Sequence, residues 1–180
     1  LFQVVQFLWN HCGQMMVKIG NSLFHHRNKL FPVFYLFLFL PSPGIFDKPI
    51  VPIIVGLCIA LSGQLIRIAT IGLKYIIRGG SNCRVYAEDL VTEGLFSHVR
   101  NPLYVGNALI IIGLGIISNS ILFNLVMTPL FLFMYQAIVR AEEDFLQGNF
   151  GPDFVDYCAD VNRWLPNFQG LGSTMKSMEF

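Results

Sequence analysis

Two clusters of polar residues carry side chains that could bind a charged small molecule. The first is the stretch from Arg100 to Gly106, which contains a guanidinium, an amide and a phenol. The second is the pair Glu142 and Glu143, about forty residues further along the chain, which contributes two carboxylates. Each cluster lies directly beside a long apolar run. We therefore interpret the two clusters as parts of one polar pocket at a membrane surface.

Four apolar segments must position these clusters. A membrane-spanning helix needs about 20 mostly apolar residues, with a range of about 17–25. In chain order the segments are Leu30–Phe46, Ile50–Ile71, Leu103–Ile117 and Ile121–Val139. The second and fourth are long enough to span a bilayer, and the first and third are shorter. The sequence predicts an all-α fold: a polytopic membrane helical bundle with about four transmembrane helices, plus interfacial helices.

The third and fourth segments are expected to form an antiparallel helical hairpin, because only residues 118–120 connect them. Its open ends carry the two polar clusters, so Arg100 and the two glutamates should lie close together. Asn101 is expected to cap the third segment, and Pro102 suits the first turn of a helix. Pro129 is expected to kink the fourth segment or to open its backbone locally.

Composition and charge place the chain in a membrane and give it an orientation. Of the 180 residues, 54% are hydrophobic and 13% are charged, whereas soluble domains carry roughly 25% charged residues. Ten lysines and arginines flank the segments on one side, and Lys48 alone lies on the other. The positive-inside rule then predicts a multi-pass protein with both termini, the loop 73–101 and the acidic pair in the cytoplasm. The expected location is a bacterial inner membrane or a membrane of the endoplasmic-reticulum type. The net charge of +1 and the lack of a basic run predict no nucleic-acid partner.

The chain is expected to have three parts. Residues 1–29 form an interfacial amphipathic segment, because apolar residues recur at helical spacing near its start, or they pack against another helix. Residues 30–166 form the membrane domain, and residues 167–180 form a flexible tail. A short helix under the bundle is predicted by an aromatic face at helical spacing, made of Phe150, Phe154, Tyr157 and Val161.

Several other residues could carry chemistry. Arg67 lies in the second apolar segment, and intramembrane charges usually face a partner or a wet cavity. We expect it to shape the pocket and to pair with Glu142 or Glu143. His98 lies two residues before Arg100 and is a candidate substrate contact. The histidines and the four cysteines lack metal-ligand or redox spacing, so we expect free thiols and no metal site.

Residues 94–106 (GLFSHVRNPLYVG) resemble the signature of the isoprenylcysteine carboxyl methyltransferase family, and the related phospholipid methyltransferases carry a similar Asn-Pro-x-Tyr-x-Gly element. Further matches are the pair Glu142–Glu143, the run Phe150-Gly151-x-x-Phe154-x-x-Tyr157 and the run Arg163-Trp164-Leu165-Pro166. The resemblance covers about residues 50–166. Asn101 stands where many members have histidine, and Phe154 where they often have tyrosine.

The resemblance implies an integral membrane enzyme that uses S-adenosylmethionine and methylates a membrane-embedded, lipid-like acceptor at a carboxylate or an amine. The residues that it assigns to the cofactor are Arg100, Asn101, Pro102, Tyr104, Gly106, Glu142 and Glu143, with Arg67, His98 and Tyr157 as further pocket residues. Arg100 would bind the methionyl carboxylate, and one glutamate would accept from the ammonium or the ribose hydroxyls. Methyl transfer from a sulfonium depends on positioning and exclusion of water, so no catalytic residue is singled out.

Two other functions remain open from the sequence. The first is a nicotinamide-dependent enzyme similar to membrane sterol reductases, which share an Arg-His-Pro-x-Tyr-x-Gly element but are usually longer. The second is a non-catalytic structural subunit of a larger membrane complex. Binding of S-adenosylmethionine rather than NADPH would separate the first of these from methyl transfer. Stable co-purification with a complex, without cofactor binding, would support the second.

Overall fold

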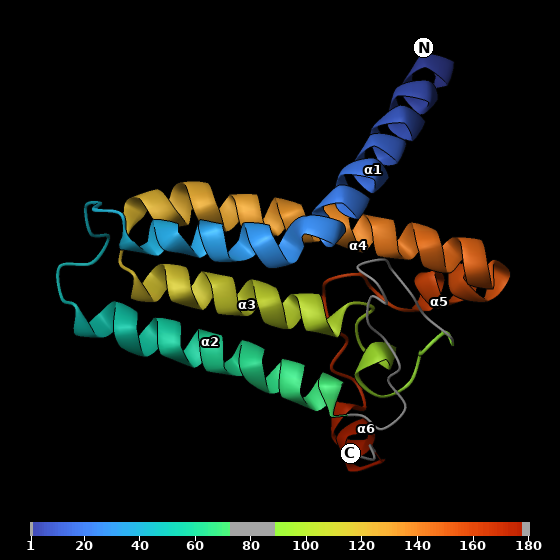
Figure 1. The fold of residues 1–180 in the computed structure, drawn as a ribbon. Helices are drawn as coiled ribbons and strands as arrows, with labels where there is room; N and C mark the ends of the chain where they lie inside the picture. Colours follow the sequence, from blue (N-terminus) through green and yellow to red (C-terminus); the bar gives the residue numbers. More distant parts are fainter. Residues whose placement is uncertain (1, 73–88, 178–180) are drawn as a thin grey trace.

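The computed structural model describes residues 2–72 and 89–177, with side chains from residue 12 onward. This part of the chain is helical and contains no strand, which confirms the predicted all-α class (Figure 1). In chain order the elements are α1 (Phe2–Tyr35), η1 (Leu36–Phe39), α2 (Ile50–Ile71), η2 (Gly94–Ser97), α3 (Pro102–Ile117), η3 (Phe123–Met127), α4 (Thr128–Phe150), α5 (Pro152–Asp160) and α6 (Leu171–Ser177). Most of the predicted loop 73–101, with Cys83, lies outside the described residues.

Within residues 2–72 and 89–177, two stretches are long and apolar enough to cross a membrane. They are α2 and the continuous run Phe123–Phe150, and α3 is a shorter apolar helix. The bounds of α2 coincide with the second predicted segment. The third predicted segment becomes α3, which starts one residue earlier, at Pro102, as expected for a proline in the first helical turn.

The N-terminal region differs from the expected division of the chain. Helix α1 runs unbroken across the boundary placed at residue 29. Its first part projects beyond the bundle, and its last part lies along α4 (Figure 1). The first predicted segment, Leu30–Phe46, is therefore split between the end of α1, the turn η1 and an irregular connection. A pair of prolines just after η1 accounts for the break, because proline lacks the N–H that a continuing helix needs.

Helices α2 and α3 pack closely because glycines face one another across the pair. A Cβ atom added to Gly113 would lie 2.6 Å from the carbonyl oxygen of Gly56. One added to Gly63 would lie 2.6 Å from the carbonyl oxygen of Gly106. Glycine at these positions lets the two backbones approach, as small residues do in membrane helix pairs. The two helices run side by side in Figure 1.

The predicted hairpin between α3 and α4 is present. Asn119, in the turn, adopts a φ of 50°, and its Oδ1 accepts hydrogen bonds from the backbone N–H groups of Ile45 and Phe46. The turn is thereby tied to the connection that precedes α2. Just before Pro129 the backbone opens locally into the π-helical turn η3. The proline itself lies in the first turn of α4, where its missing N–H is tolerated.

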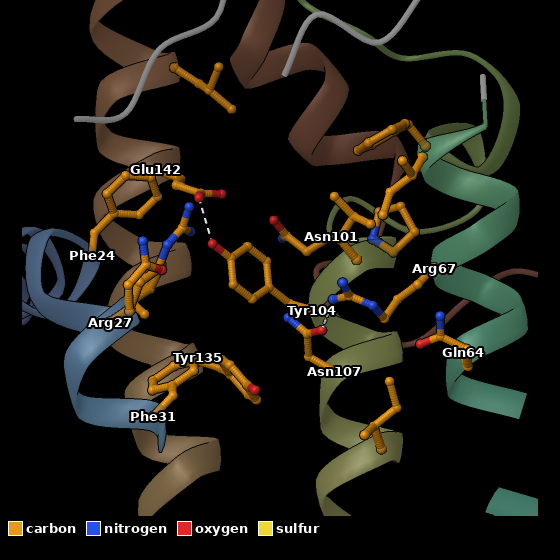
Figure 2. A pocket seen from close by; sticks show the side chains of 18 of the residues that line it. Phe24, Arg27, Phe31, Gln64, Arg67, Asn101, Tyr104, Asn107, Tyr135 and Glu142 are labelled. Atoms are coloured by element: carbon orange, nitrogen blue, oxygen red, sulfur yellow. Dashed lines mark hydrogen bonds between the residues drawn. The ribbon is translucent and has the colours of Figure 1, made fainter. Parts of the chain in front are cut away.

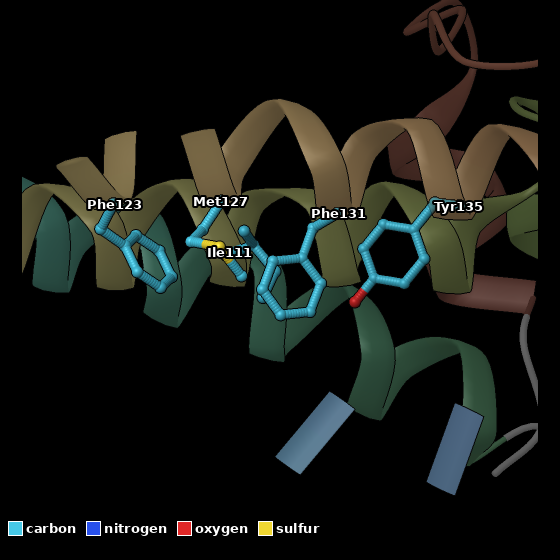
Figure 3. Close-up of a cluster of buried hydrophobic side chains, with 5 residues drawn as sticks. All are labelled: Ile111, Phe123, Met127, Phe131 and Tyr135. Carbon is cyan, nitrogen blue, oxygen red and sulfur yellow. The ribbon is translucent and has the colours of Figure 1, made fainter. Parts of the chain in front are cut away.

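A buried apolar cluster runs along the joint between η3, α4 and α3. Its members are Ile111, Phe123, Met127, Phe131 and Tyr135 (Figure 3). The ring of Phe31 in α1 meets those of Phe131 and Tyr135 edge to face, each at a centroid distance of 5.6 Å. The cluster therefore also holds the second half of α1 against α4.

The C-terminal region contains two short helices. The predicted aromatic helix is α5, where Phe154 and Tyr157 are buried together with Leu146 of α4. The tail, expected to be flexible, contains α6 among its described residues. His98 anchors this region, because its Nε2 lies 3.0 Å from the hydroxyl of Thr174 and its carbonyl accepts from Asn167.

Candidate functional site

The hairpin brings the two polar clusters together, as predicted. The Tyr104 hydroxyl of α3 donates to Glu142 Oε1 of α4 at 2.6 Å. One turn away, Asn101 Nδ2 donates to Glu143 Oε1 at 3.3 Å. Asn101 occupies the N-cap position of α3, but its side chain makes no capping hydrogen bond. The expected capping contact is therefore wrong: the amide is directed to the buried carboxylate of Glu143 instead.

Glu143 forms the centre of a buried ion cluster. Only 8% of its surface is exposed, and Arg163 binds it with two nitrogens, one of them Nε at 3.0 Å from Oε1. Arg100 Nη1 lies 3.5 Å from the same Oε1. Arg163 was seen in the sequence only as part of a motif, and no site role was given to it. A charge pair between α4 and a later loop leaves no periodic pattern that would predict it.

Arg100 faces this cluster and is not among the residues that line the pocket. Its Nη1 donates to the sulfur of Cys158 in α5, and its backbone N–H donates to the carbonyl of Asn162. Burial raises the pKa of the Cys158 thiol above its ordinary value, and the Arg100 charge opposes part of that rise. The structure thus places Arg100 behind the pocket, where it supports Glu143 and α5.

A pocket of about 590 Å³ lies between the α1–α4 pair and the α2–α3 pair. All four long helices contribute to its walls (Figure 2). The polar lining residues are Arg27, Asn28, Gln64, Arg67, Asn101, Asn107 and Glu142. The aromatic lining residues are Phe24, Phe31, Tyr35, Phe96, Tyr104 and Tyr135. This volume falls in the range of about 300–1,000 Å³ that is typical of small-molecule sites.

Arg67 extends into this pocket from α2, in accord with its expected place (Figure 2). Its predicted partner was wrong. Arg67 Nη1 donates to Oδ1 of Asn107 in α3, not to Glu142 or Glu143. The tight α2–α3 packing explains this, because it brings the two side chains together while the acidic pair lies on α4.

Three other predicted residues lie outside the pocket lining. Gly106 serves helix packing: a Cβ there would lie 2.7 Å from Arg67 Cγ and 2.7 Å from the Gly63 oxygen. Buried His98 Nδ1 lies 2.6 Å from the carbonyl oxygen of Asn167. The Tyr157 hydroxyl donates to the Phe96 carbonyl at 2.7 Å. Of the predicted residues, Asn101, Pro102, Tyr104, Glu142 and Arg67 line the pocket.

The contribution of α1 was missed from the sequence. Phe24, Arg27, Phe31 and Tyr35 all line the pocket. Their spacing of three to four residues is the signal that could have found them, because such residues share one face of a helix. The sequence alone does not say which partner that face meets.

Comparison with known proteins bears on this geometry. The sequence profile of a family described as phospholipid methyltransferase matches residues 51–153, more than half of the chain. The nickel-cobalt-cadmium resistance protein NccN of Alcaligenes xylosoxydans xylosoxydans is 33% identical over 111 residues, covering 59% of this chain and 52% of that protein. The cobalt-zinc-cadmium resistance protein CzcN of Cupriavidus metallidurans is also 33% identical over 111 residues, covering 59% of this chain and 51% of that protein. The chain thus spans about half the length of these relatives. No solved structure matches it.

Proposed function

Because this chain belongs to the phospholipid methyltransferase family, a family of membrane methyltransferases, we propose that it transfers a methyl group from S-adenosylmethionine to a lipid-like acceptor in the membrane. The acceptor atom is a carboxylate oxygen or an amine nitrogen. The pocket between the two helix pairs is the proposed site of the reaction.

The lining residues fit the chemical groups of this cofactor. The Glu142 carboxylate can accept from an ammonium or from ribose hydroxyls, and the Arg67 guanidinium can bind a carboxylate through its planar fork. We assign the carboxylate of the cofactor to Arg67 and not to Arg100, because Arg67 lines the pocket and Arg100 does not. The rings of Tyr104 and Tyr135, with centroids 5.8 Å apart, offer faces for an adenine or for a sulfonium cation.

The protein's part in the reaction is to position the reactants and exclude water. Bound S-adenosylmethionine would supply an electrophilic methyl group, and its sulfur would keep the electron pair of the carbon–sulfur bond when the methyl passes to the acceptor atom. Tyr104 holds the Glu142 carboxylate in one orientation through their hydrogen bond. The aromatic lining residues keep water away from the reacting atoms.

The observation that carries this proposal is the Tyr104–Glu142 hydrogen bond inside a pocket of about 590 Å³. It joins the family element around Asn101 and Pro102 to the acidic pair. Both residues of the hydrogen bond line the pocket. The same pocket has apolar walls at the level of Ile110 and Tyr135, which suits an acceptor that carries a hydrocarbon chain.

A mass-shift assay tests the proposal. The purified protein in lipid nanodiscs is incubated with membrane lipids and S-adenosylmethionine that carries a trideuterated methyl group. We expect a lipid-soluble product that contains the labelled methyl. Glu142→Gln should abolish the product, and Asp144→Asn, an exposed change on the same helix, should leave it intact. Label transfer that survives Glu142→Gln would overturn the assigned site.

We also propose a multi-pass arrangement with both termini and the polar end of the pocket in the cytoplasm. The positive-inside distribution of lysine and arginine supports this orientation. Alkylation of a cysteine introduced at exposed Asp144, by a reagent that cannot cross the membrane, tests it. The cysteine should react in inverted vesicles and should be protected in intact cells.

A further inference from the structure

On the face of α1 that lines the pocket, a cation is followed by two aromatic rings. Arg27, Phe31 and Tyr35 follow one another at intervals of four residues and all three line the pocket. Residues at this spacing lie above one another on one side of a helix. The wall thus places two aromatic rings after this cation, while the Phe24 ring lies before it and under the guanidinium. That order matches an amphiphile with an anionic headgroup and an apolar chain.

The described part of the pocket lining contains two cations, whereas S-adenosylmethionine has one carboxylate. Among the described lining residues, Arg27 and Arg67 are cationic and Glu142 is acidic. Neither arginine forms an ion pair with a described carboxylate: Arg27 lies over the Phe24 ring at 4.1 Å, and Arg67 donates to Asn107. One guanidinium suffices for the single carboxylate of S-adenosylmethionine. The other is available to a second ligand.

The division of roles follows from where the two arginines lie. Figure 2 shows Arg27 reaching into the pocket from α1 and Arg67 from α2, on opposite sides of Tyr104. Arg67 lies within residues 51–153, which match the family profile, and Arg27 lies outside them. In the proposed function the cofactor is the property that the family shares, so we assign it to the arginine inside the matched segment. We propose that Arg27 binds the oxyanion headgroup of the methyl acceptor, a carboxylate or a phosphate, and that Phe31 and Tyr35 contact its apolar chain.

The surroundings of α1 support access from the bilayer. Edge-to-face contacts with Phe131 and Tyr135 hold the Phe31 ring against α4. On the same stretch of α1 and η1, Val33 is 53% exposed and Leu36 is 63% exposed. Exposed apolar side chains at this level are suited to lipid. An amphiphile can therefore keep its chain in the bilayer while its headgroup reaches Arg27.

Photolabelling in phosphatidylcholine nanodiscs tests the proposal. The probes are a long-chain carboxylate, a long-chain phosphate monoester and the corresponding alcohol, each with the same photoreactive group on the chain. We expect both anionic probes to label peptides of α1 at least about tenfold more than the alcohol, because a charge-assisted hydrogen bond is lost with the neutral headgroup. Acetate or inorganic phosphate should not compete, since they lack the chain. Competition by these ions would instead indicate a site for free anions and would overturn the assignment of an amphiphile.

Substitutions at Arg27 make the test specific. Arg27→Gln should lower labelling by the carboxylate roughly tenfold, and Arg27→Lys should keep most of it. Lys29→Gln removes the same charge from an exposed position on α1 and should change nothing. Equal labelling of the wild type and Arg27→Gln, or an equal loss with Lys29→Gln, would overturn the proposal.

The identification of the headgroup ligand as a methyl acceptor rests on the proposed function, so S-adenosylmethionine binding is measured on the same samples. Arg27→Gln should bind the cofactor as tightly as the wild type, which also shows that the variant is folded. A loss of cofactor binding in Arg27→Gln would show that Arg27 belongs to the cofactor and would overturn the inference. Failure of the wild type to bind the cofactor, with headgroup-dependent labelling retained, would overturn only the proposed function.

Discussion

At the residue scale, the two adjacent glutamates of α4 have different surroundings. Glu142 lines the pocket and accepts a hydrogen bond from Tyr104. Glu143 is buried and accepts from Arg163 and Asn101, with Arg100 beside it. Neighbouring positions on a helix point about 100° apart, so one carboxylate serves the pocket and the other holds the loop that contains Arg163.

Removal of the Tyr104 hydroxyl is predicted to weaken cofactor binding. Tyr104→Phe removes the 2.6 Å hydrogen bond that orients Glu142 and should raise the Kd for S-adenosylmethionine roughly tenfold or more. Equilibrium dialysis measures this. Tyr157→Phe is the matched control, because Tyr157 is not among the residues that line the pocket and its hydroxyl donates to a backbone carbonyl, that of Phe96. If both variants lose affinity for S-adenosylmethionine equally, the loss in Tyr104→Phe does not come from the hydrogen bond to Glu142.

Loss of the Glu143 charge is predicted to destabilise the protein. Glu143→Gln leaves the guanidiniums of Arg163 and Arg100 without their buried carboxylate, which should cost about 3 kcal/mol of the free energy of unfolding. Thermal unfolding in detergent detects the loss. Asp144→Asn, which removes an exposed carboxylate from the next position, should unfold like the wild type. Equal stability of Glu143→Gln and the wild type would contradict a clamping role.

Cys158 is predicted to react at higher pH than an ordinary thiol. Burial raises the pKa of its thiol, so the thiolate forms only above the usual value of about 8.5. The folded protein then holds this proton to higher pH than the unfolded chain. The stability that it contributes is complete below about 8.5 and is lost as pH rises through the folded-state pKa.

The rate of alkylation of Cys158 as a function of pH, measured by mass spectrometry, checks this. The same cysteine in the denatured chain is the reference. Arg100→Gln should shift the midpoint to still higher pH, because the Arg100 charge lowers the pKa of this thiol. A midpoint at or below that of the denatured chain would contradict the burial of Cys158.

At the scale of elements, the α2–α3 pair depends on glycine. Gly113→Ala places a Cβ 2.6 Å from the Gly56 oxygen and 2.7 Å from the Ala60 nitrogen, both of them backbone atoms. Because the helices must separate, we predict a loss of about 1–3 kcal/mol in stability. Gly148→Ala has no atom within 4 Å of the added Cβ and should be neutral or slightly stabilising. Thermal unfolding of the two variants should therefore differ, and equal midpoints would argue against close α2–α3 packing.

Some helices and contacts could be predicted from the sequence and others could not, for physical reasons. The positions of α2 and α3 could be predicted because apolar runs and the prolines that bound them are local properties of the sequence. The path of α1 could not be predicted, since its partner on α4 is about a hundred residues away in sequence. The partner of Arg67 was missed for a similar reason: helical spacing shows which residues share a face but not how two helices are rotated against each other.

At the scale of the whole molecule, the pocket is a joint product of two helix pairs. Residues 51–153 supply α2, α3 and α4, and α1 closes the remaining side. The proximity of Tyr104 and Glu142 was predictable from segment and loop lengths alone. The separation of Arg100 from the pocket could not be predicted in this way. It depends on contacts with α5 and on the Arg163–Glu143 pair, which involve residues that follow the hairpin in the sequence.

The most direct test of the proposed methyl transfer is equilibrium binding of radiolabelled S-adenosylmethionine to the purified protein in nanodiscs. We predict saturable binding that S-adenosylhomocysteine displaces and NADPH does not. The Glu142→Gln variant should lose this binding, and Asp144→Asn should keep it. A folded wild-type protein that shows no saturable binding, or from which NADPH displaces the ligand, would contradict a methyl-transfer site between these helices.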